Sequence, residues 1–139
     1  MFKKYLRFIA SLFACVILFT SCSHSKYSWN NVMDDVNLLN ENNYSVYLEN
    51  TSENKEYANK EFASWGLDIT VTNIIGCAKN DSSIIYFEEF ESEKQAKDLY
   101  EYQLSTLGED RSVKFCLKGD ILISSNVDEA ISLLGYNFI

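Results

Sequence analysis

The chain has 139 residues, of which 47% are hydrophobic and 23% charged, a composition that fits one globular domain and excludes a wholly disordered or wholly membrane-embedded protein. All twenty acidic residues follow Cys22, where nine basic residues face them and leave a net charge of −11. A domain this acidic repels phosphate backbones and anionic membrane surfaces. We therefore expect no nucleic-acid partner.

The first 21 residues have the three parts of an export signal. A cationic start over residues 1–7 precedes an almost wholly apolar run over residues 8–19, and two small residues, Thr20 and Ser21, follow. This run is about a dozen residues long, whereas a permanent transmembrane helix needs about 20. We interpret residues 1–21 as a signal peptide that sends the rest of the chain outward.

The end of this signal, Leu18-Phe19-Thr20-Ser21-Cys22, resembles the lipobox of bacterial membrane lipoproteins. In that family the cysteine is joined to a diacylglyceryl group, and a dedicated signal peptidase then cuts just before it. The resemblance implies a cut at the Ser21–Cys22 bond and a lipid on Cys22, which anchors the mature chain to the extracytoplasmic face of the cell membrane. Cys15, inside the apolar run, leaves with the signal. The alternative is an ordinary secretory signal with an incidental cysteine.

Residues 22–27 are expected to form a short lipidated tether, and they contain His24, the only histidine of the chain. A folded active site that uses histidine as a base or as a metal ligand is therefore excluded. This observation removes the Ser-His-Asp and Cys-His mechanisms together. We predict neither a cofactor nor a metal site.

Residues 28–139 are predicted to form a single domain in which helical and strand patterns alternate. In the first half we expect a helix over 29–39 capped by Ser28, a strand over 44–48, a helix that begins at Ser52 and is closed by Gly66, and a strand over 67–78. In the second half we expect a strand over 83–88 and a helix that begins with the capping box Ser92-Glu93-Lys94-Gln95. A hairpin of 113–117 and 121–123 about Gly119-Asp120 and a helix over 127–134 complete the series.

Without its first helix this series has the order βαββαβ of the ferredoxin-like fold, with one more strand and helix appended. We therefore predict an α+β fold with an antiparallel sheet, whose strands over 44–48 and 83–88 are central. The second of these is apolar on both faces, which is typical of a covered strand. The helix over 29–39 is expected on the face that the two crossover helices leave open. The element order also resembles that of small uncharacterised α+β lipoproteins, which implies no activity.

Two groups of side chains have both a functional and a structural interpretation. The acidic run over residues 88–93 carries the oxygen ligands that calcium needs but lacks the glycine turn of an EF-hand, and we interpret it as a solvated helix start. Eight tyrosines follow the signal. Among them Tyr47 and Tyr86 are candidates for an aromatic surface that binds a partner, and the alternative is that they are core residues.

Cys77 and Cys116 are the remaining cysteines. In the ferredoxin-like strand order they lie on opposite edges of the sheet, three strand spacings or about 14 Å apart. A disulfide needs Cα atoms within about 7 Å. We therefore predict two free thiols.

Two classes of function remain open. The first is a non-enzymatic lipoprotein that binds an envelope protein or a small ligand. The second is a small carboxylate-dependent hydrolase at the cell surface. The absence of a folded histidine and of a nucleophile motif favours the first class, whereas a deep cleft with two converging carboxylates would favour the second.

Overall fold

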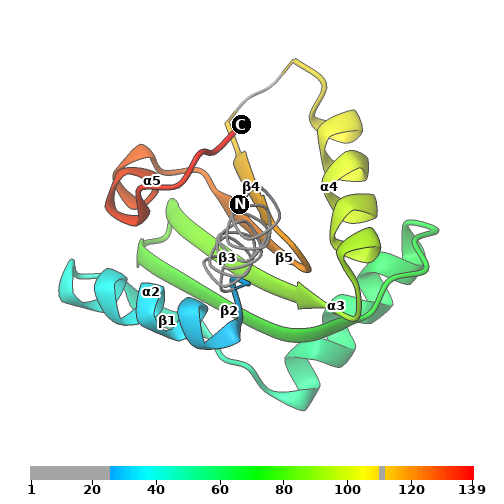
Figure 1. The fold of residues 1–139 in the computed structure, drawn as a ribbon, viewed down its shortest axis with the longest axis horizontal. Coiled ribbons are helices and arrows are strands. Elements are labelled where there is room, and N and C mark those ends of the chain that lie inside the picture. Colours follow the sequence, from blue (N-terminus) through cyan, green and yellow to red (C-terminus); the bar gives the residue numbers. More distant parts are fainter. Residues whose placement is uncertain (1–25, 110–111) are drawn as a thin grey trace, which may run out of the picture.

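The structure, a computed structural model, describes residues 26–109 and 112–139, so the predicted signal peptide and Cys22 lie outside the described residues. The elements are α2 (Trp29–Glu41), β1 (Ser45–Leu48), α3 (Ser52–Ser64), β2 (Val71–Asn80), β3 (Ser83–Phe90), α4 (Glu93–Leu107), β4 (Lys114–Lys118), β5 (Ile121–Ser125) and α5 (Asp128–Leu134) (Figure 1). Every predicted element is present. In the part of the chain described, no helix combines the length and the apolar character that crossing a membrane requires.

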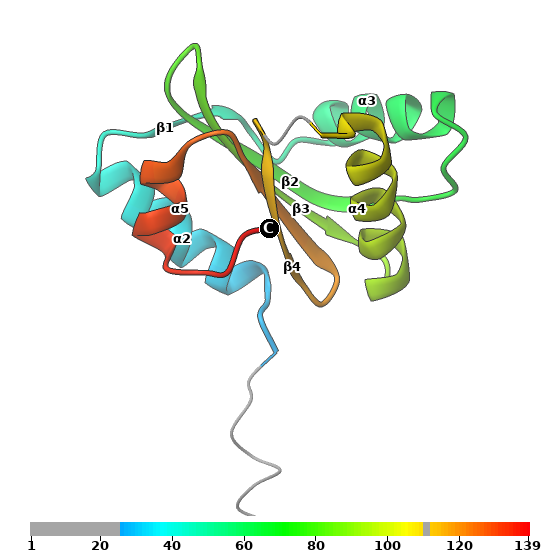
Figure 2. The same ribbon diagram turned by 90° about the horizontal axis from the view of Figure 1, so that it is seen from above.

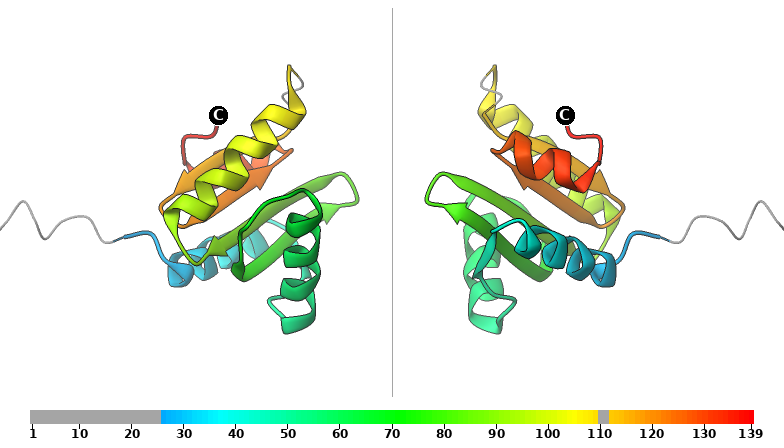
Figure 3. Two further views of the ribbon diagram at one scale, coloured as in Figure 1. Left: turned by 90° about the vertical axis from the view of Figure 1, so that its right-hand side faces the viewer. Right: turned by 90° about the vertical axis from the view of Figure 1, so that its left-hand side faces the viewer.

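The five strands form one antiparallel sheet in the order β1-β2-β3-β5-β4, with helices on both faces. Helices α2 and α5 cover one face, and α3 and α4 cover the other (Figure 2; Figure 3). Each layer of helices buries its own core against the sheet. The α+β class, the antiparallel sheet and the position of the first helix on the face opposite α3 and α4 are confirmed.

The strand order expected from the ferredoxin-like fold is wrong. Strand β1 lies at an edge and pairs antiparallel with β2, whereas β5, expected as an appended strand, lies between β3 and β4. The physical reason is that the side chains of these two strands differ in how deeply they are buried. All five residues of β5 are buried, so this strand needs helices on both faces, whereas β1 alternates exposed and half-buried residues and suits an edge.

Half of the predicted capping box at the start of α4 is also wrong. The Ser92 side chain accepts a hydrogen bond from the Gln95 backbone N–H at 3.3 Å, as expected. The Gln95 Oε1 atom instead accepts from the backbone N–H of Thr70 at 2.9 Å. Thr70 immediately precedes β2, so this hydrogen bond links the start of α4 to the start of β2.

The prediction of two free thiols is confirmed, since Cys77 and Cys116 are both buried and unbridged. The expected placement at opposite edges is wrong for Cys77, because β1 lies outside β2, whereas Cys116 is on the edge strand β4; β2 and β4 are still three strand spacings apart. Both contribute to the core beneath α2 and α5. Burial raises the pKa of the Cys77 thiol to about 11, which keeps it protonated at neutral pH.

Candidate functional site

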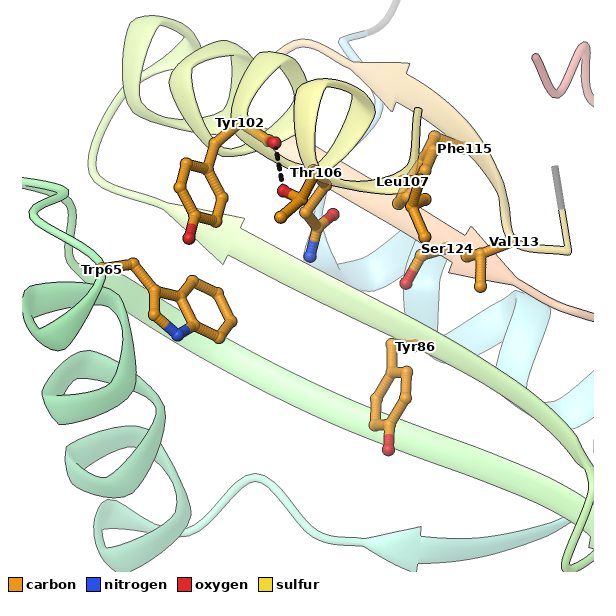
Figure 4. A pocket seen from close by; sticks show the side chains of 9 residues that line it. Trp65, Tyr86, Tyr102, Thr106, Leu107, Val113, Phe115 and Ser124 are labelled. Atoms are coloured by element: carbon orange, nitrogen blue, oxygen red, sulfur yellow. Dashed lines mark hydrogen bonds between the residues drawn. The ribbon is translucent and has the colours of Figure 1, made fainter. Parts of the chain in front are cut away.

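A groove lies on the sheet between α3 and α4. It consists of two adjoining cavities of about 460 and 270 Å³, and Trp65, Tyr86, Gln103 and Ser124 line both. Figure 4 shows the larger cavity, with α4 on one side, Trp65 opposite and the strands that carry Tyr86 and Ser124 as its floor. This space is termed the α3–α4 groove.

The register of the central strands builds the floor of the groove. Tyr86 on β3 lies opposite Gly76 on β2 and Ser124 on β5. Two residues further along, Glu88 lies between Ile74 and Leu122. Because side chains two residues apart in a strand point to the same face, Tyr86 and Glu88 both face the layer of α3 and α4.

Gly76 makes room for the tyrosine on this floor. A Cβ atom at Gly76 would lie 3.0 Å from the Cε1 atoms of both Tyr86 and Tyr47. The two rings meet edge to face, with their centroids 5.8 Å apart. The structure thus brings together the two tyrosines singled out from the sequence, one in the floor of the groove and the other 47% exposed beside it.

Aromatic side chains also form the mouth of the groove. Trp65, at the end of α3, is 40% exposed and stacks on Tyr102 of α4 with their centroids 5.5 Å apart and their planes at 12° (Figure 4). Tyr57 lines the smaller cavity and is 65% exposed. Exposed aromatic side chains gathered at one concave site are typical of surfaces that bind a ligand or a partner.

Glu88 is the most unusual residue of the groove. Its side chain is only 9% exposed, and no hydrogen bond or ion pair reaches it from the described residues. Leu48, Phe62 and Ile74 line the same cavity. Burial raises the pKa of the Glu88 carboxyl to about 7, because this apolar setting disfavours the charged form.

The interpretation of residues 88–93 as a solvated helix start is therefore wrong for the first three of them. Glu88, Glu89 and Phe90 belong to β3, and α4 begins only at Glu93. Strand alternation turns Glu88 to the groove, while Glu89 accepts a hydrogen bond from the Asn73 amide at 2.5 Å. Within the described ranges, no group of three or more metal-binding side chains is found.

A second buried acceptor faces the groove from α4. The Oε1 atom of Gln103 is buried and has no hydrogen-bond partner in the described part of the chain, and Gln103 lines both cavities. Buried polar atoms are normally paired, because an unpaired one loses its bonds to water without replacement. The Glu88 oxygens are not fully buried, but like Gln103 Oε1 they have no protein partner in the described part of the chain, so both side chains present free acceptors to the groove.

The described lining of the groove includes acidic side chains but no basic one. Six lysines of the described chain form ion pairs elsewhere. The Nζ atom of Lys118 lies 3.7 Å from the ring centroid of Tyr136, outside the groove. No basic side chain is among the described residues that line either cavity, whereas Glu61 lines the smaller one together with Glu88.

No protein-family model matches the chain, and no curated protein or solved structure matches it. A function for this chain therefore has to be inferred from the residues and geometry of the groove.

Proposed function

We propose that this protein is a lipid-anchored binding protein of the extracytoplasmic face of the cell membrane and that the α3–α4 groove is its ligand site. One observation carries the proposal: the carboxyl of Glu88, a residue that is only 9% exposed, and the buried Oε1 atom of Gln103 face an aromatic-walled groove with no partner among the described residues. Ligand pockets combine apolar walls with a few convergent polar groups of this kind. A groove filled only for packing would pair such groups.

The start of the described chain supports an anchor that leaves the groove open. The Nζ atom of Lys26 lies 3.0 Å from the Oδ2 atom of Asp120, a residue of the turn between β4 and β5. Tyr27, the last residue of the predicted tether, donates a hydrogen bond to Asp35 of α2 at 2.5 Å and contacts the core beneath α2 and α5. The chain thus enters the domain on the face opposite the groove (Figure 2).

The anchor is tested by changing its cysteine. Cys22→Ser should leave an uncleaved precursor that incorporates no labelled fatty acid. Cys15→Ser is the matched control, because this cysteine belongs to the predicted signal and its loss should leave both processing and labelling unchanged. Normal processing and labelling of the Cys22→Ser protein would overturn the proposed anchor.

The ligand site is tested with the two tryptophans, which lie on opposite faces of the sheet. Trp65 lines the groove, whereas Trp29 contacts the core beneath α2 and α5. Full-length Trp29→Phe and Trp65→Phe proteins, each with one reporter, are titrated with small amines, sugars, carboxylic acids and short peptides. A groove ligand should change the emission of Trp65 saturably and leave that of Trp29 unchanged. If no class of compound affects Trp65 selectively, the groove is not the ligand site.

A hydrolase is the second candidate, and one observation favours it. Glu88 and Glu61 line the same cavity, and the Glu88 pKa of about 7 suits a general acid. Of these two residues only Glu88 is buried, so the groove has one buried carboxyl where the mechanism uses two carboxyls. A hydrolase should cleave members of a panel of nitrophenyl esters and glycosides, and Glu88→Gln and Glu61→Gln should each abolish turnover. Absence of turnover by the unaltered protein would exclude this candidate for those substrates.

A further inference from the structure

The two unpartnered acceptors define the chemistry that a groove ligand must supply. The ionised carboxylate of Glu88 and the Oε1 atom of Gln103 accept hydrogen bonds and donate none. Neither receives a hydrogen bond within the described part of the chain. A ligand that satisfies both must therefore bring N–H or O–H donors to the floor of the groove.

Charge favours a cationic donor over a neutral one. The described residues that line the smaller cavity include two carboxyl side chains and no basic one. The chain beyond Cys22 carries a net charge of −11, which attracts cations over long range. A charge-assisted hydrogen bond to a carboxylate is also about twice as strong as one between neutral groups.

The residues that line the groove suit an organic cation better than a metal ion. Calcium takes about six to eight oxygen ligands. Among the described residues no three metal-binding side chains come together in this lining, where Glu88 is the one buried carboxyl, and the walls are aromatic. The faces of Trp and Tyr rings attract organic ammonium groups and contact the apolar part of a ligand. Glu88 lines the smaller cavity of about 270 Å³, and the adjoining cavity of about 460 Å³, which shares Trp65 and Tyr86 with it, has a volume within the usual range for small ligands and leaves room for the body of one.

We propose that the groove binds a primary ammonium compound with an aromatic or alkyl body, an inference that depends on the groove being the ligand site. The ammonium group donates to the Glu88 carboxylate and to Gln103 Oε1. The body of the ligand lies against Trp65 and Tyr86. A quaternary ammonium group has no N–H and leaves both acceptors unsatisfied, so the site discriminates against it.

The inference is tested on full-length Trp29→Phe protein in a non-ionic detergent, at about pH 8 so that Glu88 is ionised. The probes are phenethylamine, its N,N,N-trimethyl analogue and 2-phenylethanol, and the emission of Trp65 is the readout. Phenethylamine should bind at least about tenfold more tightly than the other two. Glu88→Gln should weaken phenethylamine binding at least about tenfold and leave 2-phenylethanol unaffected.

Two further variants separate the site from net charge and from the fold. Glu129→Gln makes the same change in charge on α5, where Glu129 is exposed and pairs with Lys79 at 2.8 Å, and should not alter binding. Gln103→Leu removes the second acceptor and should weaken phenethylamine several-fold. Circular dichroism checks that each variant is folded.

The possible outcomes distinguish the ammonium inference from the proposal that the groove is a ligand site. If phenethylamine and 2-phenylethanol bind equally and Glu88→Gln has no effect, the ammonium inference is wrong and the groove is still a ligand site. If none of the three probes alters Trp65 emission, the ammonium inference is again wrong, and the wider ligand panel then decides whether the groove binds ligands at all.

Discussion

Glu88 makes the stability of this protein fall as pH rises, the opposite of the effect of a carboxylate that is paired in the native state. Its pKa rises from 4.5 to about 7, because burial removes water from the charged form. In the unfolded chain the group ionises at its ordinary value. Between these two pKa values the native state binds more protons than the unfolded state, so the free energy of unfolding decreases with pH.

The magnitude follows from the same two values. Each unit of pKa difference corresponds to about 1.4 kcal/mol. Between the ordinary pKa of 4.5 and the native value of about 7, ionisation of Glu88 therefore lowers the free energy of unfolding by about 3 kcal/mol. The stabilising effect of the neutral acid is complete below the lower pKa and is lost as pH rises through the upper one.

Glu88→Gln removes this dependence, because an amide of the same shape does not titrate. Urea unfolding of wild-type and variant residues 23–139, followed by circular dichroism, measures the difference at several pH values. From about pH 4 to about pH 8 the variant should gain about 3 kcal/mol relative to the wild type. Any constant cost of burying the amide cancels in this comparison, as do the other titrating groups. A difference that is the same at every pH would refute the argument that Glu88 is buried without a partner.

Three further predictions concern the fold. Leu99 is fully buried, so Leu99→Ala should lower the free energy of unfolding by about 2–5 kcal/mol in urea titrations. Ser92→Ala removes a helix cap and should lower the same free energy by about 0.5–2 kcal/mol. Gly76→Ala should shift the NMR signals of the neighbouring tyrosine rings and lower stability by about 1–3 kcal/mol, because its Cβ would lie 3.0 Å from three side chains. Alkylation of unfolded, unreduced protein should modify both Cys77 and Cys116, and a disulfide between them found by mass spectrometry would contradict the observed sheet.

The helices and strands could be predicted because their signals are local. In α4 the cap at Ser92 and the buried residues Ala96 and Leu99 follow one another at helical spacing. Gly135 ends α5 in the left-handed conformation, as its position after the apolar stretch indicates. The central position of β3 was also predictable, since its apolar residues face both layers of helices.

Strand order depends on pairing between distant segments, and the order of elements alone does not determine it. One local signal pointed to the correct arrangement. Ile121, Leu122 and Ile123 are consecutive apolar residues, and such a run requires cover on both faces, which an appended edge strand lacks. The four residues of β1 alternate in exposure, as suits an edge strand.

The groove was only partly predictable. Tyr47 and Tyr86 could be named as candidates because both are aromatic residues on predicted strands, and their binding role stays a prediction. Trp65 and Gln103 come from α3 and α4, and only the folded chain brings them together. Glu88 had a sequence signal: it lies between Tyr86 and Phe90 on one face of a strand that is apolar on both faces, where a carboxylate is costly.

The carboxyl that weakens the fold at neutral pH is the group to which we assign the ammonium ligand, so ligand binding and stability are linked through one proton. A cation binds the ionised form of Glu88, and a ligand that binds only the native state raises its stability according to its affinity. The increase in melting temperature caused by phenethylamine should therefore grow between about pH 5 and about pH 8, while the stability contributed by Glu88 itself declines. Both trends should disappear in Glu88→Gln. An equal increase at the two pH values would mean that the ammonium group binds somewhere other than at Glu88.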